Sequence, residues 1–173
     1  MLDCGKIIAD ILYDCNKPPK GGIEQGIVLI NRSDIDKALT VVDSDVATGK
    51  HSITSLVLKT GATGYLIEGI QSKQIFMAGY TINVADDQPD DFTHTINVRL
   101  FNCNEQSSSI VNNLAVGADL VAVARHKNGC IEVYGFDGGL KVSEGARSSS
   151  ENRGSTTLTL SSVGVDTESK TPY

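Results

Sequence analysis

The chain of 173 residues has no tryptophan and only five tyrosines and four phenylalanines. Surfaces that stack nucleic-acid bases or sugar rings are built from aromatic side chains, so this composition leaves little material for one. Cationic residues are also few, because 15 lysines and arginines stand against 21 aspartates and glutamates, for a net charge of −6. Tight binding to nucleic-acid phosphates needs a basic face, and we do not expect such binding here.

Long apolar runs are missing as well. None approaches the roughly 20 residues that cross a bilayer, so we expect no membrane span. The start of the chain, Met1–Ile8, lacks the basic residues and unbroken apolar stretch of a secretion signal, which predicts folding in the cytoplasm. A reducing compartment keeps thiols free, and we interpret the four cysteines as small buried hydrophobes. They are Cys4, Cys15, Cys103 and Cys130.

Catalytic and metal-binding motifs are not visible. No serine lies in a Gly-x-Ser-x-Gly elbow and no cysteine has a Cys-x-x-Cys partner. His51, His94 and His126 lie in separate segments without the spacing of metal ligands, so we interpret them as structural or exposed. We therefore predict a protein that is not an enzyme and that needs neither a metal nor a cofactor.

What is present favours a mainly β domain. About eight short apolar runs are separated by turn residues, and a single helical period covers Glu105–Val116. The Asn128-Gly129 pair between two apolar runs is a strong hairpin signal. So many strands bury both faces of their sheets only by closing or stacking, which predicts a β-barrel or sandwich with one flanking helix. We place this domain at 23–164, followed by a C-terminal tail at 165–173.

The first 22 residues read as an arm and a linker. Ile7, Ile8, Ile11 and Leu12 have the spacing of one side of a short helix, and the segment 16–22 contains two prolines and two glycines that break it. Two interpretations stay open. The four apolar side chains complete the protein's own core, or the linker lets the arm cover a neighbouring subunit at an interface.

A long β-hairpin is the most informative prediction. Lys73–Val84 and Phe92–Phe101 are both β-rich, and the turn between them is acidic. In the second run Ile96, Val98 and Leu100 alternate with polar residues, which predicts a strand with one face toward the core and the other toward water or a partner. Two runs of this length extend roughly 30 Å, more than a domain of this size needs to cover its core, so their outer part should contact a partner. The tip of the hairpin carries four aspartates, for which three interpretations stay open: a solvated end, residues that contact a partner, or ligands of a hard cation. The spacing of the aspartates does not match an EF-hand. These are Asp86, Asp87, Asp90 and Asp91.

The C-terminal half resembles a known family. A β-run ending in Asn97–Phe101, a helix, an Asn-Gly turn and the run Val133–Leu140 before a last strand at Thr156–Leu160 follow one another in this order. This order, and above all the Val-Tyr-Gly-x-Asp-x-Gly-Leu run, resembles the tail-tube-like structural proteins of tailed bacteriophages. Those include tail ring proteins of the short-tailed crAss-like group and their prophage relatives.

The resemblance implies a virion protein, made in the host cytoplasm, whose subunits join into a hexameric or dodecameric ring around a DNA passage. The DNA would pass without specific binding, and the other partners would be tail or portal-proximal structural proteins. The N-terminal arm has no counterpart in the simplest tube proteins, which leaves open a tube, ring, completion or accessory subunit. The alternative function is a carbohydrate-binding or adhesive β-sandwich module, which the same strand count and acidic loop would suit.

Overall fold

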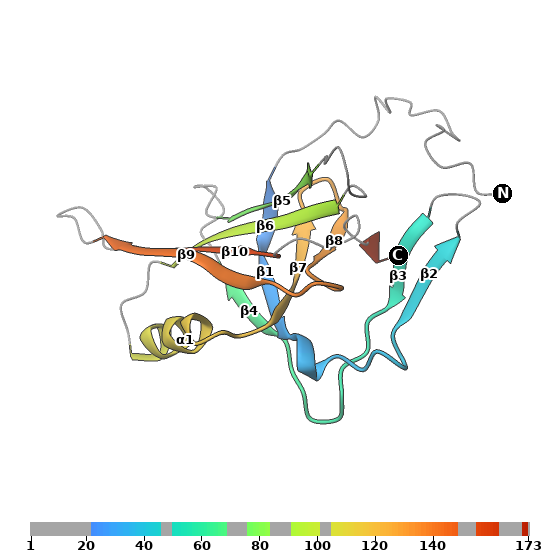
Figure 1. Cartoon of the computed structure of the whole chain (residues 1–173), viewed down its shortest axis with the longest axis horizontal. Helices are drawn as coiled ribbons and strands as arrows, with labels where there is room; N and C mark the ends of the chain where they lie inside the picture. The colour runs from blue at the N-terminus through green and yellow to red at the C-terminus, as the bar shows by residue number, and fades with distance from the viewer. Residues whose placement is uncertain are drawn as a thin grey trace.

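The computed structural model describes residues 22–45, 50–68, 76–83, 91–100, 105–148, 155–162 and 171–172. The fold is mainly β, with 61% of these residues in strands and one short helix, which confirms the predicted class. Several antiparallel sheets are present and, within the described ranges, none closes into a barrel, so the barrel alternative is wrong. The strands bury their faces by stacking instead (Figure 1).

Two four-stranded antiparallel sheets form the body of the molecule. The first has the order β4 (Tyr65–Glu68), β1 (Ile23–Asn31), β7 (Leu120–His126) and β8 (Ile131–Tyr134). The second has the order β5 (Phe76–Asn83), β6 (Asp91–Leu100), β10 (Ser155–Ser161) and β9 (Lys141–Ser148). The second sheet lies across the first (Figure 1).

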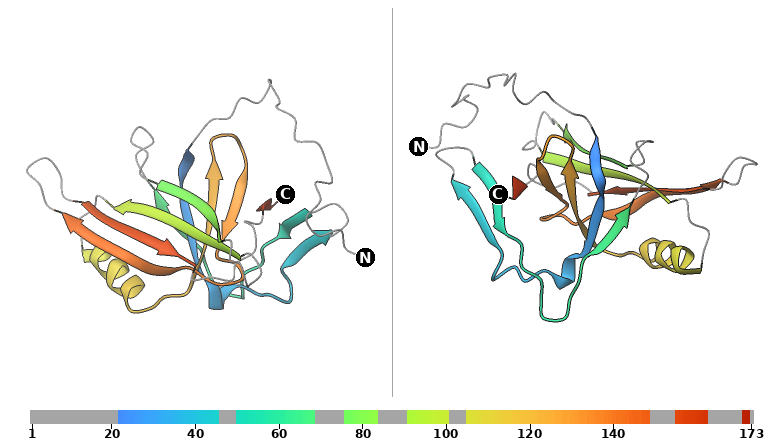
Figure 2. Two further views of the ribbon diagram at one scale, coloured as in Figure 1. Left: turned by 45° about the horizontal axis from the view of Figure 1, so that its top comes forward. Right: turned by 180° about the vertical axis from the view of Figure 1, so that it is seen from behind.

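Three smaller pieces complete the fold. A 3-10 turn, η1 (Arg32–Asp34), follows β1, and the helix α1 (Glu105–Ala115) lies beside β9. A third sheet, to one side of the body in both views of Figure 2, has the order β11 (Thr171–Pro172), β3 (Lys50–Ser55) and β2 (Val41–Asp45).

The central strands β1 and β7 of the first sheet are covered on both faces. On β1, Ile27 and Leu29 point into the core that this sheet shares with the second sheet and with Leu114 of α1. The alternate residues, Val28 and Ile30, point to the opposite face, where they pack in another apolar cluster that also contains Ile53 of β3. This arrangement explains the unbroken apolar runs 27–30 in β1 and 120–124 in β7, since a strand segment covered on both sides has no polar face.

The second sheet has one buried and one open face. Ile96 and Val98 of β6 are buried, whereas Arg99 is exposed, which confirms the predicted alternation. The predicted long hairpin is also confirmed, because β5 pairs with β6 from Phe76↔Val98 to Asn83↔Asp91. Leu158 and Leu160 of β10 extend the buried face beside β6.

Two further local predictions are confirmed. The Asn128-Gly129 pair lies between β7 and β8, where Gly129 has a φ of +88°, a conformation that glycine adopts without steric cost. The helix begins at Glu105 and ends at Ala115, close to its predicted bounds.

Three expectations need correction. The segment 147–154 is rich in serine and arginine, a composition that predicts a loop, but β9 continues to Ser148 because it pairs with β10 along its length. Within the expected tail at 165–173, Thr171 and Pro172 pair in parallel with β3, so this part does join a sheet. Cys130 is a free, exposed thiol rather than a buried hydrophobe, because it follows the turn between β7 and β8.

Candidate functional site

Most of the site residues expected from the sequence lie outside the described ranges. This applies to the arm residues Ile7, Ile8, Ile11 and Leu12, and to Asp86, Asp87 and Asp90 at the hairpin tip. Asp91 is the first residue of β6, and its backbone pairs with Asn83 of β5. The described residues instead offer an open sheet edge and three side-chain clusters.

The open edge is β5, the outermost strand of the second sheet. Its eight residues, Phe76–Asn83, include no charged residue and no proline, and Met77 is 65% exposed. The other edge of the same sheet, β9, carries the charged residues Lys141, Glu144 and Arg147, all exposed. β5 lacks the charges and the proline that block an edge, and it presents no like charge to oppose those of β9.

Beside this edge lies an apolar surface formed by the exposed Tyr80 and Ile82 and the half-buried Phe92, which we call the β5–β6 apolar surface. The register pairs Ile82 with Phe92 and Tyr80 with His94, on the same face as the buried Ile96. Tyr80 is 43% and Ile82 54% exposed, and the rings of Tyr80 and Phe92 meet edge to face with centroids 5.5 Å apart. The apolar face of the second sheet thus extends beyond the part that is buried in the core.

A polar cluster adjoins this surface on the β7–β8 hairpin. The hydroxyl of Tyr134 donates to Oε2 of Glu132, which also lies 3.1 Å from Nε2 of His126. The Tyr134 hydroxyl lies 3.4 Å from the same His126 nitrogen. Burial above all, then the hydrogen bond to Glu132 and the negative charge of that carboxylate, raise the pKa of Tyr134 well above its ordinary value.

His94 of β6 links the second sheet to the polar cluster on the first sheet. It is 2% exposed, its Nδ1 accepts the backbone N–H of Gly135 at 2.9 Å, and its ring centroid lies 5.5 Å from that of Tyr134. Its own backbone N–H donates to Oγ of Ser162. These contacts serve packing and orientation. His94 and His126 are 32 positions apart in the printed sequence and both reach Tyr134, a convergence that spacing along the chain does not signal.

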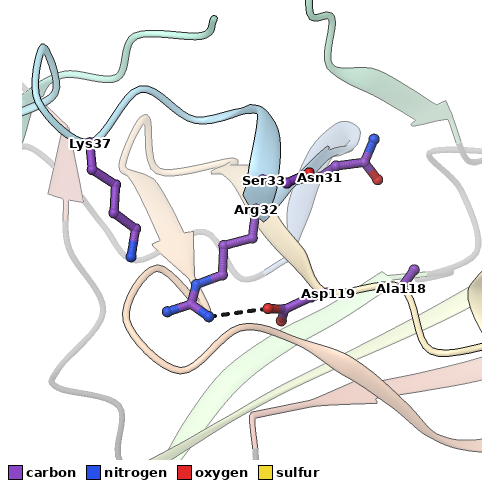
Figure 3. A pocket seen from close by; sticks show the side chains of 6 residues that line it. All are labelled: Asn31, Arg32, Ser33, Lys37, Ala118 and Asp119. Carbon is purple, nitrogen blue, oxygen red and sulfur yellow. Dashed lines mark hydrogen bonds and ion pairs between the residues drawn. The ribbon is translucent and has the colours of Figure 1, made fainter.

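The third cluster lines an open pocket of about 470 Å³ between η1 and the start of β7 (Figure 3). Nη1 of Arg32 lies 3.1 Å from Oδ2 of Asp119, and its Nη2 donates to the backbone carbonyl of Asp137. The guanidinium therefore ties three separate segments together. Lys37 extends into the same space, and Nζ of Lys59 donates to the carbonyl of Ser33 at 2.6 Å. Arg32 and Lys59 therefore hold backbone segments in place around this pocket.

Two kinds of feature are absent from the described part of the chain. No group of three or more histidine, cysteine, aspartate or glutamate side chains there is arranged to hold a metal ion. Among the helical residues described, none belongs to a segment with the length and apolar character that a membrane crossing requires. In comparisons with known proteins, no family model, curated protein or solved structure matches the chain.

Proposed function

We propose that the chain is a structural subunit of a phage tail, which forms a ring or tube around the DNA passage by pairing its sheets with those of neighbouring copies. The observation that carries this proposal is the open, uncharged edge of β5. A long edge strand without charges or proline is a template for another strand, and proteins that stay monomeric normally block such an edge. The resemblance of the C-terminal half to tail-tube-like proteins supplies the biological setting.

The topology of the second sheet suits head-to-tail pairing. Because its neighbouring strands are all antiparallel in the order β5-β6-β10-β9, the two edge strands run in opposite directions. A rotation that places β9 of one copy beside β5 of the next therefore gives an antiparallel pair. Both edge strands have eight residues. Repeated contacts of this heterologous kind close into a ring when the rotation allows it.

Net charge supports the role of a conduit. With a charge of −6, each copy contributes negative charge to the assembly. A wall that repels phosphate lets a duplex slide instead of adhering, whereas a basic wall would bind it. The proposed subunit therefore has no sequence-specific contact with DNA.

A carbohydrate-binding role has weaker support. Tyr80 and Phe92 are the aromatic side chains available beside the polar cluster, but their rings are inclined at 64° to one another. They do not form one flat platform for the face of a sugar ring. The structural role therefore remains the function that the described residues favour.

The role of the edge is tested by a charge placed on β5. Thr81 is exposed and belongs to the face of β5 that also carries Met77, away from the core. We expect Thr81→Lys to fold normally and to lower self-association at least about tenfold, because a new strand would have to desolvate the ammonium. Sedimentation velocity over a range of protein concentrations measures this.

A matched control lies on a central strand of the same sheet. Thr157 of β10 is exposed on the same outer face, opposite Arg99, but β10 already has a partner on each side. Thr157→Lys should leave self-association unchanged. Equal behaviour of the two variants would rule out pairing through β5.

A further inference from the structure

The β5–β6 apolar surface leaves part of the inner face of the second sheet without cover from described residues. Tyr80 and Ile82 follow the half-buried Ala78 on the face of β5 that packs against the core. Even with the cover that the first sheet supplies, Tyr80 is 43% and Ile82 54% exposed. An apolar face of this kind needs a cover of matching chemistry.

The N-terminal arm leaves the body close to this surface. The carbonyl of Gly22, the first described residue, accepts the N–H of Lys127 at 2.9 Å, and Ile23 pairs with His126. The arm therefore departs at the turn end of the β7–β8 hairpin. From there a series of contacts leads to the surface: His126 meets the Tyr134 hydroxyl, and the Tyr134 ring meets His94, whose ring centroid lies 6.2 Å from that of Tyr80.

We propose that this surface is the docking site of the chain's own N-terminal arm, which covers it with Ile7, Ile8, Ile11 and Leu12. These four side chains have the spacing of a single apolar helix face. The nine residues between Leu12 and Gly22 span up to about 30 Å when extended, enough to reach along one sheet of a small domain. The two prolines of that linker favour an extended backbone.

Docking within one chain is favoured over docking between copies by concentration. A short tether holds the arm near its own surface at an effective concentration in the millimolar range, far above that of free protein at micromolar concentration. The inference does not depend on the proposed tail function, because it concerns the isolated subunit. It gives the N-terminal arm a definite place on the domain.

The test measures the access of solvent reagents to Ile82. In the full-length chain, Ile82→Cys is labelled with a maleimide, and the labelled peptide is identified by mass spectrometry, which separates it from the native cysteines. The same substitution is then placed in a chain that also carries Ile8→Asp and Ile11→Asp. We expect labelling at position 82 to be about tenfold slower with the native arm than with the charged arm, a ratio worth about 1.4 kcal/mol.

Val116→Cys is the control for reactivity, since Val116 is 90% exposed beyond the end of α1. Its rate should be the same with either arm. Equal rates at position 82 with the two arms would overturn the proposal. Protection that is present at about 100 µM but disappears at about 1 µM would assign the cover to the arm of a second copy and would also overturn it.

Discussion

At the residue scale, two side chains carry contacts between parts of the chain that are far apart in sequence. Tyr134 is buried at the end of β8, where its ring packs against His94 and its hydroxyl donates to Glu132. Arg32 follows β1 and joins Asp119 to the turn at Asp137. Each of these two residues gives a measurable prediction.

Tyr134 makes the stability of the protein fall at high pH. Its pKa in the folded protein is raised, so folded Tyr134 keeps its proton when an unfolded tyrosine, with a pKa near 10, has lost it. The stabilisation is complete below about pH 10 and is lost as the pH rises further, by about 1.4 kcal/mol at pH 11. Urea unfolding of wild type and Tyr134→Phe at pH 8 and pH 11 isolates this contribution, because phenylalanine does not titrate.

We expect the free energy of unfolding of wild type to decrease between these pH values by about 1.4 kcal/mol more than that of the variant. A parallel decrease in the two proteins would show that Tyr134 ionises as freely in the folded protein as in the unfolded one.

Arg32 and Arg125 should contribute differently to the free energy of unfolding. The ion pair of Arg32 with Asp119 is half-buried and is joined by a hydrogen bond to a backbone carbonyl. The pair of Arg125 with Glu24 has an N–O distance of 2.7 Å, but the arginine side chain is 64% exposed. We expect Arg32→Ala to cost about 1–2 kcal/mol and Arg125→Ala less than about 0.5 kcal/mol in urea unfolding. Similar costs would contradict the bracing role of Arg32.

At the scale of elements, hydrophobic pattern predicted most of the strands. The alternation at Ile96–Leu100 predicted a strand with one buried face, and the Asn-Gly pair predicted the turn between β7 and β8. The continuous apolar runs of β1 and β7 marked strands that are covered on both sides. In each case the local sequence carries the information, because burial of one or both faces determines which positions are apolar.

The sequence did not predict β9 and β11, because these strands depend on partners elsewhere in the chain. β9 contains Lys141, Glu144, Gly145 and Arg147, a composition typical of a loop, and it is held in place by pairing with β10. β11 has only two residues and depends on β3. Their partners are distant in the chain, so tertiary pairing overrides local preference.

The candidate site was less predictable than the fold. The uncharged character of Phe76–Asn83 is visible in the sequence, but its position at the edge of a sheet depends on strand order. The cluster of His126, Glu132 and Tyr134 arises from the register of one hairpin. The sequence placed contacts in the arm and the hairpin tip, and of those residues the structure describes only Asp91, whose backbone pairs with Asn83.

At the scale of the whole molecule, the second sheet has two unlike edges. Among the described residues, no strand pairs with the outer side of β5 or with the outer side of β9. The edge strand β5 is uncharged and the edge strand β9 is charged, so the two differ in chemistry. Pairing β5 of one copy with β9 of the next leaves neither edge exposed at that contact. A closed ring leaves no such edge exposed, which an isolated copy or an open chain of copies cannot achieve.

The most direct test of this account is the native mass of the full-length protein at about 10 to 100 µM, a range in which a specific interface of micromolar affinity is populated. We predict one closed species of six or twelve copies, seen as rings by negative-stain electron microscopy. A mass of 18.4 kDa at every concentration, the mass of a single chain, would contradict the claim that β5 pairs with a neighbouring copy.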